Sequence, residues 1–328
     1  MKFPAIVLLL PGLVCADWTQ QFGSNEKTDW ASITRIANEN TNGQQEALAA
    51  GKTLIVTLTQ QNAVGGMAEY YAYIENGGAE EWTQYIMTRV LETGGDAIWQ
   101  IGNEINGKAK TVPGYDVMPT YVEYFLAPTL AGIFRADRAT GLYTRVMLGS
   151  VANAGSQDNR DWLRTLLDYR IQGTYAPDLA GWLVRDVIDI ASIHYMATAS
   201  RDFDSAVADI QSMGVPVWAT EEVGRKVASA GLGGAVTLRV VNRYLNTGIT
   251  SLLWGSLIGS PSGNEAMQTL SGFLGAVELT YQDGYWDAGD RRIRVLTSSF
   301  DTVQMADWAG ELSVEIHVFR KGSKEVIV

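Results

Sequence analysis

The chain has 328 residues, of which 46% are hydrophobic and 19% charged, and its 36 acidic and 25 basic residues give a net charge of -11. This apolar content is too high for a disordered chain, no apolar stretch is long enough to cross a bilayer, and the acidic balance disfavours nucleic acid as a partner. A single cysteine excludes an intrachain disulfide and a thiolate metal site.

The amino terminus predicts a signal peptide over residues 1–16. Lys2 supplies a positive charge, residues 5–14 form an apolar core, and Ala16 ends a plausible cleavage site. We therefore expect a secreted or periplasmic protein whose only cysteine, Cys15, is removed with the signal. A buried first strand or helix is one alternative, and a lipidated Cys15 is another.

A strand followed by a helix recurs from residue 53 onward. Short apolar and β-branched runs predict the strands, and helical spacing predicts the helices after them. The predicted strands are 53–59, 97–101, 145–151, 187–195, 215–220 and 249–254, and the predicted helices are 81–92, 121–134, 161–169, 203–213, 236–245 and 265–273. Strands and helices that alternate in this way imply an α/β fold with a parallel sheet.

The region before residue 53 decides the architecture. A (β/α)8 TIM barrel needs two more units from this region, with 18–22 and 33–36 as strands and 44–50 as a helix. The first unit would then lack a proper helix. We expect a catalytic barrel over 17–277, and an open doubly wound sheet is the structural alternative.

After residue 277 the pattern changes to short strands without helices. Residues 312–319 alternate between apolar and polar side chains, as expected of an antiparallel strand with one solvated face. The sequence therefore predicts a small C-terminal antiparallel β-appendage over 278–328. Within it, residues 281–286 are interpreted as a plain turn rather than a substrate-edge loop, because they contain an Asp-Gly step.

Polar side chains cluster where the predicted barrel strands end, which is where barrel enzymes hold their catalytic groups. These strand ends carry Asn103 and Glu104, His194 and Tyr195, Glu221 and Glu222, and finally Trp254. Cleavage of a glycosidic bond requires two carboxyl groups facing one cleft, one protonated as the acid and one ionised as the nucleophile or base.

Four segments resemble, in order along the chain, the strand-end motifs of the clan A retaining glycoside hydrolases, which are (β/α)8 barrels. Residues 99–104 (WQIGNE) resemble the Asn-Glu motif of the fourth strand, and residues 216–221 (PVWATE) resemble the nucleophile segment of the seventh. Residues 192–195 (SIHY) resemble the sixth-strand segment, and Trp254 resembles the eighth-strand tryptophan. The similarity covers roughly residues 53–258, and family 39, family 5 and their neighbours all remain open.

The resemblance implies catalytic roles for two carboxyl groups. Glu104 would be the general acid/base, Glu221 would be the nucleophile, and Asn103 would bond the 2-hydroxyl of the sugar. Arg35 would correspond to the second-strand arginine that keeps the nucleophile ionised through a charge-assisted hydrogen bond.

The remaining matched residues would shape the substrate site. Tyr195 would orient the nucleophile, His194 would bind substrate or tune a carboxylate, and Trp254 would form the floor of the sugar subsite. A satisfied structural histidine and a core tryptophan are the alternatives for the last two.

Glu222 directly follows Glu221 and is the alternative nucleophile. Adjacent strand residues point to opposite faces, so only one of the two can face the barrel mouth while the strand stays regular. The number of residues from Trp218 favours Glu221 as the nucleophile, whereas the number of residues to Gly224 favours Glu222.

These features predict a secreted retaining β-glycoside hydrolase that cleaves β-linked oligo- or polysaccharides by double displacement. With two histidines and no zinc or nucleotide motif, the sequence predicts no cofactor and no metal. Carbohydrate is the expected partner, without nucleic acid or a membrane span, and the oligomeric state stays open. The alternative is a non-catalytic carbohydrate-binding barrel.

Overall fold

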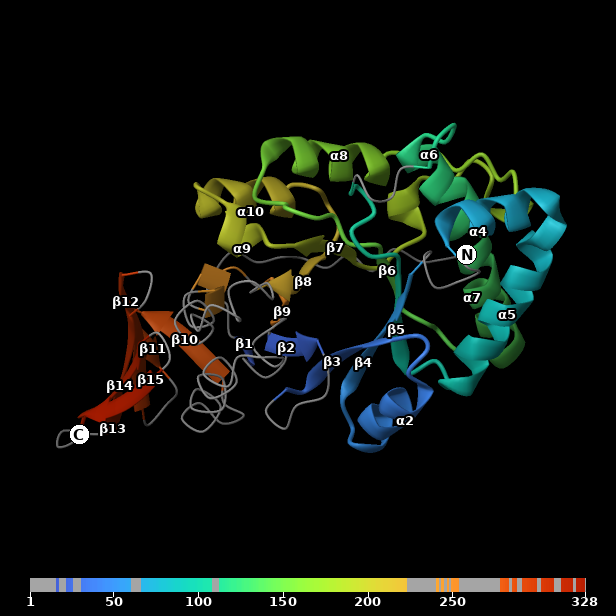
Figure 1. The fold of residues 1–328 in the computed structure, drawn as a ribbon. Coiled ribbons are helices and arrows are strands. Elements are labelled where there is room, and N and C mark those ends of the chain that lie inside the picture. Colours follow the sequence, from blue (N-terminus) through green and yellow to red (C-terminus); the bar gives the residue numbers. More distant parts are fainter. Residues whose placement is uncertain are drawn as a thin grey trace.

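Parallel strands and helices alternate along most of the chain in its computed structural model (Figure 1). The structure describes residues 16–17, 22–25, 31–59, 66–107, 112–222, most of 240–253, and the strands between 278 and 327. Within these ranges, no helix is long and apolar enough to cross a membrane. The alternation of strands and helices makes this an α/β fold.

Eight parallel strands form the central sheet, in the order β6-β5-β4-β3-β2-β9-β8-β7. Along the chain they are β2 (Phe22–Asn25), β3 (Ile33–Ala37), β4 (Thr53–Leu58), β5 (Ala97–Ile101), β6 (Val146–Leu148), β7 (Ala191–His194), β8 (Val217–Glu222) and β9 (Ser251–Leu253). Parallel bridges from Met147 to Ile190 and from Val151 to Ile193 join the β6 and β7 edges. The sheet therefore closes on itself as a barrel.

The barrel strands bury side chains on both faces, because one face lines the interior and the other meets the helices. All five residues of β5 (AIWQI) are buried, and so are all residues of β4 (TLIVTL) except its first. Inside the barrel, one apolar layer is formed by Ile33, Ile55, Ile98, Met147, Ile190 and Leu252. This layer fills the centre, so the interior is packed core and not a pore.

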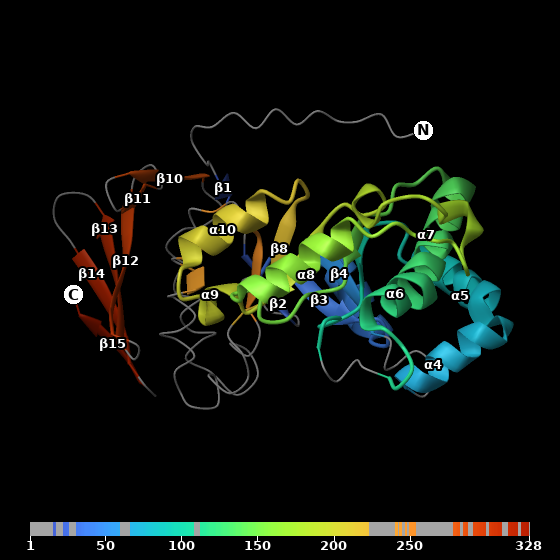
Figure 2. The ribbon, with the colours of Figure 1, turned by 90° about the horizontal axis from the view of Figure 1, so that it is seen from above.

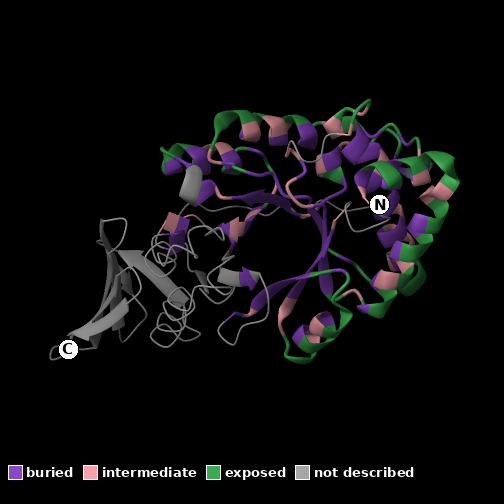
Figure 3. Ribbon diagram, in the orientation of Figure 1, coloured by how far each residue is buried: buried purple, intermediate pink, exposed green. Residues whose placement is uncertain are grey.

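The described helices lie above the barrel, to its right and, for α2, below it in the view of Figure 1, and their exposed residues are on the outer side (Figure 3). They are α2 (Thr41–Ala49), α4 (Met67–Tyr73), the π-helical η1 (Ile74–Gly78), α5 (Ala79–Glu92), α6 (Val117–Thr120), the π-helical η3 (Tyr121–Leu126), α7 (Ala127–Thr140), α8 (Gln157–Leu167), the 3-10 turns η4 (Pro177–Leu179) and η5 (Val184–Asp186), α9 (Met196–Ala199) and α10 (Phe203–Gln211). Ser156 and Asp202 cap α8 and α10 by accepting from backbone N–H groups three residues on.

The predicted elements between residues 31 and 222 are confirmed, with shifts at their ends. The helix expected at 81–92 is preceded by α4 and η1, because non-helical angles at Asn76 and Gly77 break the periodicity between the two halves. The strand expected at 18–22 lies instead at 22–25. Only a short connection separates β2 from β3, and its described residues, Ala31 and Ser32, are not helical.

The C-terminal strands form a second sheet, which is antiparallel throughout (Figure 2). Its strands are β1 (Ala16–Asp17), β10 (Glu278–Gln282), β11 (Tyr285–Asp287), β12 (Arg291–Ser299), β13 (Thr302–Ala309), β14 (Val314–Arg320) and β15 (Ser323–Ile327). The turn expected at 281–286 is shorter than predicted, because Tyr281 pairs with Trp286 and Gln282 with Tyr285 in a hairpin. The Asp-Gly step between them is typical of tight hairpins.

Three predictions fall on residues that the structure does not describe. Residues 1–15 of the predicted signal peptide lie outside the described residues, although Ala16 lies in β1 and pairs with Leu279. The helix expected at 265–273 and Trp254 also lie outside them.

Candidate active site

The carboxyl ends of the barrel strands have unusual backbone geometry. Glu104, Asn153 and Tyr195 have φ angles of 49°, 53° and 56°, and among the described residues no other non-glycine residue has a positive φ. They follow β5, β6 and β7. A left-handed conformation costs free energy in such residues and is concentrated at functional sites. The strain therefore marks this end of the barrel as the candidate site.

Glu221, in β8, is held by donors from β3 and from Tyr195, the residue that follows β7. Arg35 Nη1 lies 2.7 Å from Glu221 Oε1. The Tyr195 hydroxyl donates to Oε2 at 2.8 Å, and the Tyr195 backbone N–H donates to the Glu221 carbonyl at 2.8 Å. Because each carboxylate oxygen has its own donor, the orientation of Glu221 is fixed.

The same contacts favour the ionised form of Glu221. Burial alone would raise the pKa of this carboxyl group, but any positive charge on His194, the charge of Arg35, and the hydrogen bonds from Arg35 and Tyr195 together hold the pKa below its usual value. The pKa of Tyr195 is raised, first by burial and then by the negative charge of Glu221. Tyr195 therefore keeps its proton and remains a donor.

A β-bulge in β8 decides which of its side chains face the barrel interior. The pairing register shifts between Ile193 and His194 on β7, and between Ala219 and Glu222 against β9. As a result, the adjacent residues Thr220 and Glu221 both reach His194, with Thr220 Oγ1 3.2 Å from Nε2 and Glu221 Oε2 3.5 Å from Nδ1. In a regular strand these two side chains would point to opposite faces.

Glu222 is directed to a different environment from Glu221. Its side chain is fully buried and accepts hydrogen bonds from the Tyr244 hydroxyl at 2.6 Å and from the Ala197 backbone N–H at 3.1 Å. These contacts tie β8 to α9 and to the helical residues around 244. The structure thus brings Glu221, rather than Glu222, to Arg35 and Tyr195.

Glu104 and Glu221 meet at the His194 ring. His194 Nδ1 lies 3.3 Å from Glu104 Oε1 and 3.5 Å from Glu221 Oε2. One ring or carboxylate atom from each of the three residues lies within 4.8 Å of the other two. The Glu104 side chain is 36% exposed and that of Glu221 only 12%. The pair is asymmetric, because Glu104 is partly open to solvent whereas Glu221 is largely buried and paired with Arg35.

Asn103 lies beside the two carboxyl groups. Its Oδ1 accepts from Arg35 Nη2 at 2.6 Å and from the Ser150 hydroxyl at 3.3 Å. Ser150 Oγ in turn accepts from the Glu104 backbone N–H at 2.9 Å. Because the Asn103 oxygen is engaged, its NH2 group is the part that can donate to a ligand.

Three further polar residues, which sequence analysis did not single out, lie beneath this group. Gln100 Oε1 accepts from Arg35 Nε at 2.6 Å, and Gln100 Nε2 donates to Ser192 Oγ at 3.2 Å. Ser192 Oγ is 2.5 Å from Thr220 Oγ1, and all three side chains are fully buried. A sequence signal was present, since Gln100 interrupts the apolar strand AIWQI and a buried polar group needs partners.

Of the described residues, Glu104, His194 and Glu221 form the group whose atoms lie close enough to hold a metal ion. Arg35 already places a positive charge 2.7 Å from Glu221, and a metal cation at the same carboxylate would be repelled by it. The arrangement suits proton transfer better than metal binding, and the metal-free site stays a prediction.

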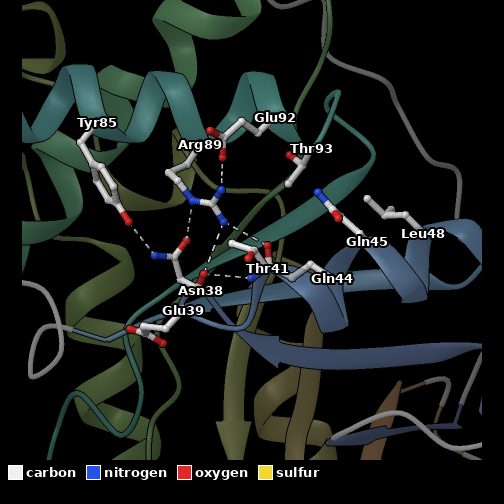
Figure 4. Close-up of a pocket in the computed structure, with 10 residues that line it drawn as sticks. All are labelled: Asn38, Glu39, Thr41, Gln44, Gln45, Leu48, Tyr85, Arg89, Glu92 and Thr93. Carbon is white, nitrogen blue, oxygen red and sulfur yellow. Dashed lines mark hydrogen bonds and ion pairs between the residues drawn. The ribbon is translucent and has the colours of Figure 1, made fainter.

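Apart from the candidate site, a hollow lies outside the barrel, between α2 and α5 (Figure 4). It is lined by Asn38, Glu39, Thr41, Gln44, Gln45, Leu48, Tyr85, Arg89, Glu92 and Thr93. Arg89 Nη2 donates to Gln44 Oε1 at 3.1 Å and to the Asn38 carbonyl at 3.3 Å, and Asn38 Nδ2 donates to the Tyr85 hydroxyl at 2.9 Å. The polar groups that line this hollow bond one another and connect α5 to α2 and to the end of β3. We call this contact the joint between α2 and α5.

The structure brings most of the predicted site residues together at one end of the barrel. The residues that meet there are Glu104, Glu221, Asn103, His194, Tyr195 and Arg35. Trp254, the predicted floor of the sugar subsite, lies outside the described residues.

No protein-family profile and no curated protein sequence matches this chain. Solved structures match its fold. A protein from Neocallimastix frontalis aligns with a TM-score of 0.53 and 10% identity, over 85% of this chain and 70% of its own. A GH30 endoxylanase from Clostridium papyrosolvens (TM-score 0.48, 13% identity, 91% and 80% covered) and a fungal β-1,4-galactanase (0.46, 15%, 70% and 78%) also align. At such identities the likeness concerns the fold alone.

Proposed function

We propose that this chain is a secreted retaining β-glycoside hydrolase that cleaves β-linked oligo- or polysaccharides, with a catalytic (β/α)8 barrel and a C-terminal β-appendage. The observation that carries the proposal is the carboxylate pair of Glu104 and Glu221, with oxygens within 4.8 Å of each other. Retaining glycosidases hold these groups about 5–5.5 Å apart and inverting ones about 6.5–9.5 Å apart. The short separation, together with the clan A motifs in the sequence, supports retention.

In the first step, Glu221 attacks the anomeric carbon and forms a covalent ester with the sugar, while the bond from this carbon to the leaving oxygen breaks. Glu104 gives its proton to that oxygen. In the second step, Glu104, now a carboxylate, takes a proton from water, and the water oxygen displaces Glu221 from the anomeric carbon. Glu221 is restored as a carboxylate and Glu104 as an acid, so both are ready for the next turnover.

The neighbouring residues support each step. Arg35 and Tyr195 hold Glu221 ionised and oriented before substrate arrives, which lowers the cost of positioning in the transition state. The Asn103 NH2 group, beside both carboxyl groups, would donate to the sugar 2-hydroxyl, a contact that strengthens as positive charge develops at the anomeric carbon.

The experiment that tests the proposal is hydrolysis of chromogenic β-glycosides and of plant and microbial polysaccharides. Glu104→Gln and Glu221→Gln should each abolish turnover with the fold intact, whereas the matched control Glu222→Gln should keep the catalytic pair. NMR of the first product should show the β-anomer. An α-anomer would overturn retention, and sugar binding by the unmutated protein without hydrolysis would instead favour a non-catalytic carbohydrate-binding barrel.

Rescue by azide separates the two roles. In Glu221→Gly, azide can attack in place of the missing nucleophile and should give the α-glycosyl azide from an activated substrate. In Glu104→Ala, azide can only intercept the covalent intermediate and should give the β-glycosyl azide. If the two products were exchanged between the variants, the assignment of acid/base and nucleophile would be reversed.

The proposal of secretion has its own support in the apolar, positively flanked residues 1–16. Expression of the full chain in a secreting host, followed by N-terminal sequencing of the exported protein, tests it. We expect the exported chain to begin at Asp17. A chain that stays in the cytosol with Met1 intact would contradict the proposal while leaving the catalytic assignment untouched.

A further inference from the structure

A continuous series of buried hydrogen bonds crosses the barrel interior beneath the two carboxyl groups. It starts at Arg35, whose Nε lies 2.6 Å from Gln100 Oε1. A guanidinium group only donates, so Gln100 Oε1 must be the acceptor. The Gln100 amide orientation is thereby fixed, and its Nε2 is the donor toward Ser192 Oγ, 3.2 Å away.

The other end of the series is equally constrained. His194 Nδ1 faces one oxygen of Glu104 at 3.3 Å and one of Glu221 at 3.5 Å. Glu221 is ionised through its pair with Arg35, so an unprotonated Nδ1 would place acceptor against acceptor. Nδ1 therefore carries the proton, and Nε2 points to Thr220 Oγ1 at 3.2 Å.

The two hydroxyls in the middle connect these ends. Ser192 Oγ and Thr220 Oγ1 are 2.5 Å apart, and either could donate to the other. If Ser192 donates, Thr220 Oγ1 accepts from Ser192 and, at 3.5 Å, from Gln100 Nε2, and the Thr220 hydrogen can go to His194 Nε2. If Thr220 donates, Ser192 accepts from two neighbours and His194 must hold a proton on Nε2. In the first arrangement every hydrogen bond points from Arg35 toward His194, the same direction in which Arg35 donates to Gln100.

We infer that Gln100, Ser192 and Thr220 form a one-way hydrogen-bond chain from Arg35 to His194 that keeps the histidine proton on Nδ1, with Nε2 as acceptor. All three side chains and the His194 ring are fully buried, so water does not compete for these bonds. The three act through His194 and are positioning residues.

The hydrogen-bond chain has a consequence for catalysis, which rests on the proposed function. With the proton on Nδ1, His194 donates to Glu104 Oε1 in either state of that carboxyl group. The carbonyl oxygen of a carboxylic acid is its better acceptor, so this contact favours Oε2 as the oxygen that carries the transferred proton. The buried chain therefore selects which oxygen of the acid/base delivers the proton.

Nitrogen NMR of the histidine rings tests the inference in the unmutated protein. The chain has two histidines, His194 and His317, so a His317→Gln variant assigns both. In protein labelled with ¹⁵N, ring correlations to the carbon-bound protons show which nitrogen is protonated. We expect a protonated Nδ1 and an unprotonated, hydrogen-bonded Nε2 at neutral pH. A proton on Nε2, with or without one on Nδ1, overturns the inference.

Gln100→Glu tests whether the amide sets the direction. A carboxylate accepts from both Arg35 and Ser192, so the Ser192 hydrogen turns away from Thr220 and the chain reverses. We expect a proton to appear on His194 Nε2. Thr57→Val is the matched control, because the Thr57 hydroxyl donates to Gln100 Oε1 at 3.4 Å and lies outside the series. A His194 spectrum unchanged by Gln100→Glu refutes the role of Gln100.

Thr220→Val offers an independent check should Gln100→Glu not fold. The Nε2 signal should move to that of a ring nitrogen without a donor, while Nδ1 stays protonated; an unmoved Nε2 signal refutes the contact. These readouts need no turnover, so they separate two failures. An inactive protein with a protonated Nδ1 would refute the glycosidase proposal and support the hydrogen-bond chain. An active protein with a protonated Nε2 would support the glycosidase proposal and refute the hydrogen-bond chain. In an active enzyme, Gln100→Glu should lower kcat more than it changes KM, unlike Thr57→Val.

Discussion

Replacing Tyr195 by phenylalanine tests the electrostatics of the candidate nucleophile. The phenol donates to Glu221 Oε2 at 2.8 Å, and the Glu221 side chain is only 12% exposed, so water has limited access to replace the bond. A hydrogen bond to a charged group contributes about 1.5–3 kcal/mol, and here it favours only the ionised carboxylate. Its loss removes one of the causes that hold the pKa of Glu221 low, so this pKa should rise.

The assay is kcat/KM as a function of pH, which reports the titrating groups of the free enzyme. Because the proposed mechanism needs an ionised nucleophile, the acid limb of Tyr195→Phe should lie at higher pH than that of the wild type. On the acidic side of the limb, the variant should lose activity by roughly ten- to a hundredfold, since about 1.4 kcal/mol is a factor of ten.

The control is Tyr85→Phe, which removes the hydroxyl of an exposed tyrosine in the joint between α2 and α5. It should keep the wild-type acid limb. If the acid limb of Tyr195→Phe stays at the wild-type position or moves to lower pH, the reasoning on Glu221 is refuted.

Acid stability, the joint between α2 and α5, and metal independence give further tests. The folded pKa of Glu221 lies below its usual 4.5, so it contributes stability above that pH that is lost as the pH falls through the folded value; Glu221→Gln should show a shallower acid loss of Tm. Arg89→Met should lower the free energy of unfolding by about 1–3 kcal/mol in urea, because it leaves the buried Gln44 oxygen without that donor. Arg135→Met, which removes an exposed pair with Glu80, should cost under about 1 kcal/mol. EDTA should leave hydrolysis unchanged, and a loss restored by a divalent cation would make the candidate site a metal site.

Most of the barrel could be predicted because its strands are short apolar runs that end in polar residues. The predicted strand at 97–101 coincides with β5, and β4 ends one residue before the predicted 59. The helix before α5 could not be predicted from spacing, because Gly77 has a φ of 95° and breaks the helical period. Here a local departure from regular helix, held by tertiary packing, overrides the sequence pattern.

The candidate site was predictable in outline, since parallel strands bring their carboxyl ends to one face. The preference for Glu221 over Glu222 rested on the spacing of the motif, and regular strand geometry alone would not have given it. Trp218 packs against the interior layer, and regular alternation from it would turn Glu222 inward. The bulge in β8 reverses this, and it depends on pairing with strands far away in the sequence. For the same reason, the partners of Gln100 follow only from the closed barrel.

Departures from regular structure gather at one end of the barrel and point to the same site without any reference to sequence motifs. Glu104 and Tyr195 have left-handed backbones, β8 carries a bulge at Glu221, and a glutamine sits in a buried strand. A left-handed backbone at a non-glycine residue costs folding free energy, and such a cost persists where the surrounding structure requires the resulting geometry. All of these departures serve to direct side chains at one pair of carboxyl groups. In a barrel that served only as a scaffold, nothing would require a strained backbone at Tyr195, which contacts Glu221, or at Glu104, which contacts His194.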